Sequence, residues 1–160
     1  MSGLIGFTNR LKTGQLNASA PAFCLVKTSD QDINHASWTQ ISFGTSLHDN
    51  TGMASTSNHN FTIPSEGVWH LWMHVRTHSH MDNNEDMIIQ FRIDGSSFTS
   101  PKHHSHSWSS GTDRNIDNQI HMTYNFSGTG SVITCWTAHN EGSTITYKEG
   151  YTQFSGMKII

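Results

Sequence analysis

The chain has 160 residues, a net charge of -3 and 12 histidines against only 9 lysines and arginines together. This length is enough for one domain with a sizeable hydrophobic core. Charged residues make up 13% of the chain, compared with about 25% in an average domain. So few basic residues offer no electrostatic surface to nucleic acid. No apolar run approaches the roughly 20 residues that a membrane-spanning helix needs. We therefore expect neither nucleic-acid binding nor membrane insertion.

The first 20 residues have no sustained strand or helix periodicity, and their only large apolar side chains are Leu4, Ile5, Phe7 and Leu11. Two alternatives follow: a frayed terminus, or an anchoring arm that orders against a partner through these four side chains. The apolar part is too short for a signal peptide and no cleavage pattern follows it. We therefore expect the protein to be made in the cytoplasm of its host cell without export.

From residue 21 to 160, short apolar runs alternate with turn signals. The predicted strands are Ala22–Lys27, Trp38–Phe43, Val68–Arg76, Met87–Asp94, Ser96–Ser100, Ile116–Phe126, Ser131–Ala138 and Tyr151–Ile160. Longer loops are predicted at Gly44–Asn58, Asp82–Asp86 and Pro101–Thr112, and these are the candidate contact surfaces. No segment combines a helical period with caps. Many short strands with turns between them predict an all-β, two-sheet antiparallel sandwich, and long cross-connections make it a jelly roll.

The segment Phe61–Arg76 contains the clearest strand, because its side chains alternate strictly from Val68 onward. One face carries large apolar residues, as expected for a half-buried strand. The other face carries a tryptophan between two histidines, which is unusual for a solvated surface. The same alternation in other strands extends the predicted core to Trp69, Leu71, Met73, Val75, Ile89, Phe91, Ile120, Met122 and Tyr124.

Two motifs carry a resemblance to a known superfamily. The pattern Phe-Thr-x-Pro-x-x-Gly-Val-Trp from Phe61, closed by His74-Val75, resembles the globular heads of complement component C1q. Ser65-Glu66-Gly67 is equally similar to the tumour necrosis factor group, and the sequence 154–160 resembles the last strand of the same heads. The resemblance covers about residues 21–160.

The resemblance implies a tight homotrimer in which the strand from Val68 faces the core on one side and the threefold axis on the other. On that basis the residues expected at the trimer interface are His70, Trp72, His74, His121 and Phe154. Three copies of His70, His74 and His121 around the axis would suit a metal or an anion, because imidazole is a common ligand of transition metals. The alternative is that these histidines only fill the interface and bind nothing.

Other histidines and the acidic loop give weaker signals. His78 and His80 continue the parity of His70, and a second His-x-His pair occurs at His104 and His106. The acidic run Asp82–Asp86 contains calcium-type ligands, but we expect a solvated turn there.

Only two cysteines are present, Cys24 and Cys135. They do not form a disulfide framework. The strand order implied by the resemblance places them in different sheets, so we expect two reduced thiols; the alternative is a bridge between them.

No catalytic motif occurs in the sequence, so we do not expect an enzyme. Two function classes fit. The first is a trimeric virion structural protein of a bacteriophage: a head decoration protein, a collar or tail-fibre protein, or a fibre-tip knob. Its partners would be other virion proteins and, in host attachment, a cell-surface receptor or glycan. The alternative is a non-viral, soluble, complement-head-like module that binds a ligand. The expected absence of a signal peptide and of a Gly-x-y stalk, and the short arm, favour the virion class.

Overall fold

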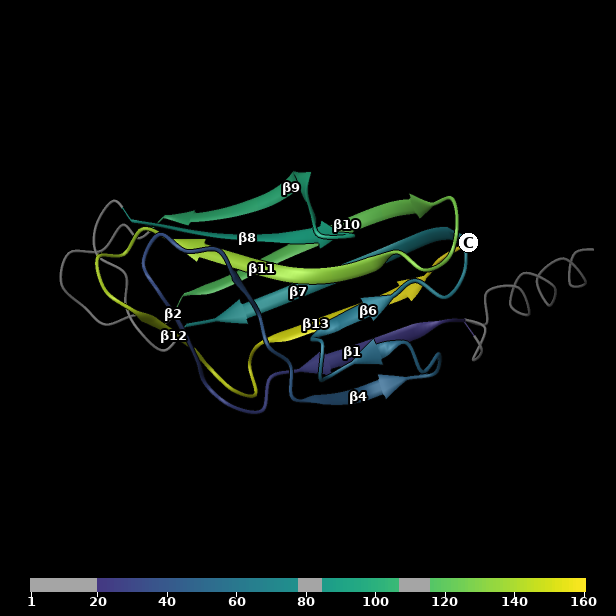
Figure 1. Ribbon diagram of the computed structural model, residues 1–160, viewed down its shortest axis with the longest axis horizontal. Helices are drawn as coiled ribbons and strands as arrows, with labels where there is room; N and C mark the ends of the chain where they lie inside the picture. Colours follow the sequence, from purple (N-terminus) through teal and green to yellow (C-terminus); the bar gives the residue numbers. More distant parts are fainter. Residues whose placement is uncertain (1–19, 78–84, 107–115) are drawn as a thin grey trace, which may run out of the picture.

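The computed structural model describes residues 20–77, 85–106 and 116–160, with the backbone alone for 98–106. Within these ranges all regular structure is β-strand, so they contain no helix that could span a membrane. The strands form two antiparallel sheets packed face to face, as Figure 1 shows. The prediction of an all-β antiparallel sandwich is confirmed.

The first sheet has five strands, and neighbouring strands are far apart in the sequence. Its order is β10 (Asp117–Phe126), β7 (Gly67–Arg76), β13 (Gln153–Lys158), β1 (Ala22–Val26) and β4 (Thr45–Asp49). The last strand therefore lies between the first strand and β7. Such long crossovers between antiparallel neighbours are the mark of a jelly roll.

The second sheet has six strands and covers the other side of the core. Its order is β5 (Ala54–Ser55), β6 (Asn60–Thr62), β11 (Val132–His139), β8 (Asp86–Ile93) and β9 (Ser96–His106), and β3 (Thr39–Gln40) also pairs with β11. A separate two-stranded ladder joins β2 (Gln31–Ile33) to β12 (Ile145–Tyr147).

The core lies between the inward faces of the two sheets. Eight of the nine predicted core side chains are at most 4% exposed: Trp69, Leu71, Met73, Val75, Ile89, Phe91, Ile120 and Met122. The ring of Phe23 stacks on Phe61 at 3.7 Å between ring centroids. Gly156 makes room for this packing, because a Cβ atom there would lie 2.6 Å from Leu71 Cδ2 and 2.7 Å from Phe23 Cε1.

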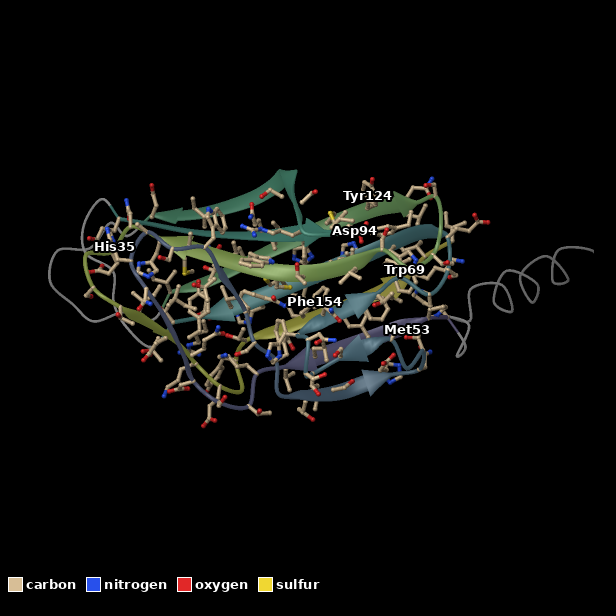
Figure 2. All side chains as sticks on the ribbon, in the orientation of Figure 1. His35, Met53, Trp69, Asp94, Tyr124 and Phe154 are labelled. Atoms are coloured by element: carbon tan, nitrogen blue, oxygen red, sulfur yellow. The ribbon has the colours of Figure 1, made fainter. Side chains whose placement is uncertain are left out.

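Tyr124 was predicted to be in the core, and this is wrong. It has the same parity as Met122 on β10, but it is 36% exposed. Its ring packs edge-on against Phe126 at 4.7 Å, near the end of β10 at the periphery of the sandwich (Figure 2). Because β10 is the outermost strand of its sheet, the second sheet does not cover every inward side chain along it.

Three predicted strand boundaries also differ. The strand predicted at Trp38–Phe43 is reduced to Thr39–Gln40, after a residue with positive φ at Ala36. The predicted loop Pro101–Thr112 begins as part of β9, which extends to His106. A proline is tolerated there because β9 is an edge strand. The predicted loop Gly44–Asn58 contains two short strands, β4 and β5.

Lys27, next to the end of β1, is only 1% exposed although it carries an amine. Its Nζ donates hydrogen bonds to Gln31 Oε1 at 2.9 Å and to the Oγ and carbonyl oxygen of Ser42 at 2.8 and 3.2 Å. Burial lowers the pKa of Lys27 to about 8, against the opposing effect of the Asp30 charge. The Lys27 amine therefore links the end of β1 to Gln31 and Ser42, and none of its hydrogen-bond acceptors is a carboxylate.

We expect Lys27 to make stability rise with pH. An unfolded lysine has a pKa of about 10.4, so between about pH 8 and that value the unfolded chain binds more protons than the folded chain. Stability therefore increases across this window and is lost as pH falls through the folded pKa. Chemical denaturation at several pH values between 7 and 10, compared with Lys27→Met, measures this effect. Parallel curves for the two proteins would contradict it; comparison with the variant cancels the contributions of other groups.

Candidate functional site

The outward face of the first sheet carries the histidines that the sequence analysis singled out. In register, Trp72 of β7 lies between His121 of β10 and Ser155 of β13. His70 and His74 lie on the same side of β7 as Trp72, two residues before it and two residues after it. We call the set His70, Trp72, His74 and His121 the histidine face.

Trp72 is the centre of the histidine face. Its indole is half-buried and stacks on the His74 ring at 6.2 Å between centroids, with 8° between the planes. The His121 ring lies on it at 6.0 Å and 25°. The indole Nε1 is buried and has no hydrogen-bond partner in the described part of the chain. A large aromatic surface is thus held in a fixed orientation on the outside of the sheet.

His70 and His121 form a pair of facing imidazoles. His70 Nε2 lies 3.5 Å from His121 Nδ1, and His70 Nδ1 lies 3.1 Å from Thr123 Oγ1. Both contacts are satisfied when His70 Nδ1–H donates to Thr123 and His121 Nδ1–H donates to His70 Nε2. The reverse arrangement also satisfies both, because a threonine hydroxyl donates as well as accepts, so Thr123 restrains the orientation of the His70 ring in either tautomer.

His74 does not join this pair, because its Nε2 faces Asp117 Oδ1 at 3.2 Å. Arg76 Nε lies 3.9 Å from the same oxygen. The three histidines proposed as ligands thus separate into one facing pair and one residue, His74, whose ring contacts a carboxylate. Within the described ranges no group of three or more metal-ligating side chains occurs in a single chain. A metal or anion held by several copies of His70, His74 and His121 stays a prediction.

A groove of about 410 Å³ lies on this same surface. It is lined by Ala22, His70, Trp72, His121, Ser155, Gly156 and Met157. Met157 is opposite His70 in register and is 37% exposed. The histidine face is therefore a shallow depression with largely apolar walls, and not a flat polar surface.

Phe154 was expected at the trimer interface, and its position contradicts this. Its side chain is 0% exposed and is labelled near the middle of the sandwich in Figure 2. The Phe154 ring is 4.7 Å from Phe23, 6.0 Å from Phe43 and 5.8 Å from Phe91. The reason is the alternation along β13, in which Ser155 and Met157 face outward beside β7 and Phe154 faces the core.

Several predicted features lie outside the described residues. These are the arm with Leu4, Ile5, Phe7 and Leu11, the histidines His78 and His80, and most of the acidic run Asp82–Asp86. His104 and His106 belong to β9, where they stand opposite Ile88 and Asp86 of β8 in register.

Both cysteines are free. Cys24 is half-buried on β1 of the first sheet, and Cys135 is fully buried on β11 of the second. The prediction of two thiols in different sheets is confirmed. Burial raises the pKa of both thiols, so they are held in the protonated, less reactive form.

One cluster was not predicted from the sequence. On the outward face of the second sheet, Arg92 lies over the rings of Trp38 and Trp136. These residues are far apart in the sequence and belong to different segments, so no local motif could have indicated them.

The order and pairing of the strands are those of the jelly-roll fold that complement heads and tumour necrosis factors share. The globular domain of zebrafish complement 1qA protein is 13% identical, with a TM-score of 0.63 over 88% of this chain and 98% of that one. The Eiger TNF structure from S. frugiperda is 6% identical, with a TM-score of 0.65 over 89% of this chain and 94% of that one. At these identities the likeness concerns the fold. No family model and no curated protein matches the sequence.

Proposed function

We propose that this chain is a non-enzymatic structural protein of a bacteriophage virion that acts as a homotrimer. In this proposal it is a head decoration, collar, tail-fibre or fibre-tip protein, and it contributes to attachment to a host cell. Its partners are two further copies of itself, other virion proteins and a receptor or glycan on the host cell surface.

The observation that carries the trimer is the histidine face. A half-buried indole, two stacked imidazoles and an apolar groove form one continuous outward surface on β7, β10 and β13. Exposed apolar patches bordered by polar residues usually mark interaction sites. Buried aromatic residues are also the typical anchors of protein interfaces. A second copy that covers this face would remove the Trp72 ring from water.

The direction in which the chain enters the sandwich supports a role on a particle. Asn50 Nδ2 donates to the carbonyl of Ala20 at 2.8 Å, and the Lys158 amide donates to the carbonyl of Pro21 at 2.8 Å. The chain thus enters the fold at the end that also holds the C-terminus (Figure 1). A segment before Ala20 that binds a particle would therefore leave the opposite end of the sandwich pointing outward.

That opposite end holds the strand ends from which two of the predicted contact loops start. There Arg76 pairs with Asp117, and Asp86 pairs with His106. The third predicted contact loop, Gly44–Asn58, does not lie with them, because its Asn50 contacts Ala20. We therefore limit the proposed outward contact surface to the connections that follow β7 and β9.

The alternative function is a non-viral, soluble module that binds a ligand through the same fold. The two similar structures, a complement head and a TNF, favour it at the level of the fold. The two functions differ in where the protein is found. Mass spectrometry of purified virus particles would detect this chain if the virion role is correct.

We expect replacement of Trp72 by alanine to dissociate the trimer. The indole projects outward, so its removal leaves the core intact, whereas loss of a central interface aromatic costs about 2 kcal/mol or more per contact. Multi-angle light scattering at micromolar concentration should show a trimer for the wild type and smaller species for the variant. Circular dichroism should be unchanged.

The matched control is Trp38→Ala, which removes an exposed tryptophan from a different region, beside β3 of the second sheet. It should leave the trimer unchanged. A wild-type protein that is monomeric at micromolar concentration would overturn the proposed assembly. A trimer that is equally stable without the Trp72 indole would move the interface to another face.

A further inference from the structure

Arg92 of β8 lies on the outward face of the second sheet, where its guanidinium is held against two indole rings. The Arg92 Cζ atom is 3.8 Å from the centroid of the Trp136 ring and 5.4 Å from that of the Trp38 ring. A guanidinium stacked on aromatic rings loses much of its freedom to rotate. Arg92 is thus fixed before any ligand arrives.

The supporting indoles are themselves positioned by the sheet. Trp136 Nε1 donates to Thr134 Oγ1 at 2.9 Å. Thr134 stands opposite Arg92 in the pairing of β11 with β8. Trp38 is 40% exposed, so part of its ring surface is open to solvent beside the cation. The cluster therefore combines a fixed positive charge with a flat, accessible apolar surface.

Arg92 has no counter-charge in the described part of the chain. It makes no salt bridge or hydrogen bond there, and its Nε is buried without an acceptor. Burial also lowers the pKa of the Arg92 guanidinium. On the same face of β8, Gln90 is 1% exposed and its Oε1 has no donor. Buried polar groups in folded proteins usually have a partner, so a ligand acceptor beside the Arg92 guanidinium would supply one that the described residues do not.

Arg76 is an arginine of the same protein that stacks on an aromatic ring and also has a carboxylate partner. Its Cζ also lies over an aromatic ring, that of Tyr151, at 4.5 Å. However, Arg76 Nε faces Asp117 Oδ1 at 3.9 Å. The difference between the two arginines is therefore the missing carboxylate at Arg92.

We infer that Arg92, Trp38 and Trp136 form a binding site for the carboxylate of an acidic sugar, such as a sialic or uronic acid. The planar fork of an arginine binds a carboxylate through two parallel hydrogen bonds. The exposed Trp38 ring offers the flat apolar surface that the C–H face of a pyranose ring fits. In an acidic peptide the carboxylate is on the flexible side chain of Asp or Glu and is not attached to a rigid ring. The site lies within one chain, so it does not require the trimer; its use in host attachment rests on the proposed function.

The test uses the whole chain, two acidic sugars as probes, and lactose and a short Glu-rich peptide for comparison. Ligand-observed NMR should show binding of 3′-sialyllactose or of a hyaluronan tetrasaccharide, and these two probes distinguish a sialic from a uronic acid. Neutral lactose should bind at least about tenfold more weakly, because it lacks the group that pairs with the arginine. Added salt should weaken acid binding, since the charge pair is near the surface.

Variants assign the binding to this cluster. Arg92→Gln should lower the affinity for the acidic sugars about tenfold or more. Arg92→Lys should keep only part of the wild-type affinity, because lysine lacks the planar fork. Trp38→Ala should also lower the affinity. Arg76→Gln is the control and should bind like the wild type. Equal binding of lactose and the acidic sugars, undiminished binding by Arg92→Gln, or preferential binding of an acidic peptide would overturn the site.

Light scattering on the same samples separates this result from the proposed function. A trimer that binds neither acidic sugar rejects the Arg92 site and leaves the assembly standing. A monomer that binds an acidic sugar through Arg92 rejects the assembly and leaves the site standing.

Discussion

Replacing Phe154 with alanine is expected to lower the free energy of unfolding by about 3–5 kcal/mol. The Phe154 ring is fully buried and contacts the rings of Phe23 in the first sheet, Phe91 in the second sheet and Phe43 in the connection between β3 and β4. Its loss would open a cavity that the two sheets cannot close without losing their other contacts. Since a domain is stable by only about 5–15 kcal/mol, this change removes a large part of its stability. Urea denaturation at a fixed protein concentration measures it.

Two control variants test whether the Phe154 side chain faces the core or the outside of the sheet. Phe154→Leu should cost less, because most of the buried volume is kept. Ser155→Ala, one residue along β13 on the outward face, should leave the free energy of unfolding almost unchanged. If Phe154→Ala preserved the folded subunit but dissociated an assembly, the ring would face the axis and the inward orientation of Phe154 would be wrong.

Phe154 was predicted to face outward but faces the core, and this shows when the alternation along a strand predicts the direction of a side chain. In β7 the two faces differ strongly, with apolar residues at Trp69 and Leu71 against His70 and Trp72, so orientation follows from the sequence. In β13 the residues from Gln153 to Lys158 include a serine and a glycine, and neither face is uniformly apolar. The orientation is set by the register with β7, which is a long-range property.

Tyr124 shows that the direction of a side chain does not by itself determine its burial. Its parity was predicted correctly, because Ile120 and Met122 on the same face of β10 are buried. Burial also depends on whether another layer covers the position. Since β10 lies at the edge of its sheet, the sequence of β10 alone does not reveal how far this cover extends.

For the candidate sites too, what lies within one strand was predictable from the sequence, and what depends on pairing between strands was not. The histidine face was predictable because His70, Trp72 and His74 share one strand, and period-two alternation places them together. The pairing of His70 with His121 depends on the register between β7 and β10. The separate contact of His74 with Asp117 depends on the same register. The Arg92 cluster joins three segments of the chain, and only the folded sheet brings them together.

Deleting residues 1–20 should leave the sandwich folded and trimeric but abolish its incorporation into virus particles. The described fold begins with β1 at Ala22, and the core contacts all come from residues after it. The four apolar side chains of the deleted segment, Leu4, Ile5, Phe7 and Leu11, are too few to form a core of their own. In the proposed role they are buried by another virion protein, so their loss removes attachment without unfolding the domain.

The control for this deletion keeps the segment and changes only its four apolar residues to serine. Both proteins should show the same circular dichroism and light scattering as the full chain, and both should be absent from particles purified after infection. The full chain should be present in the same preparation. If the shortened chain still assembled onto particles, the anchor would lie elsewhere in the sandwich. If the full chain occurred only as a free cellular trimer, the ligand-binding module would become the better account, because a segment with no particle to bind would have no anchoring role.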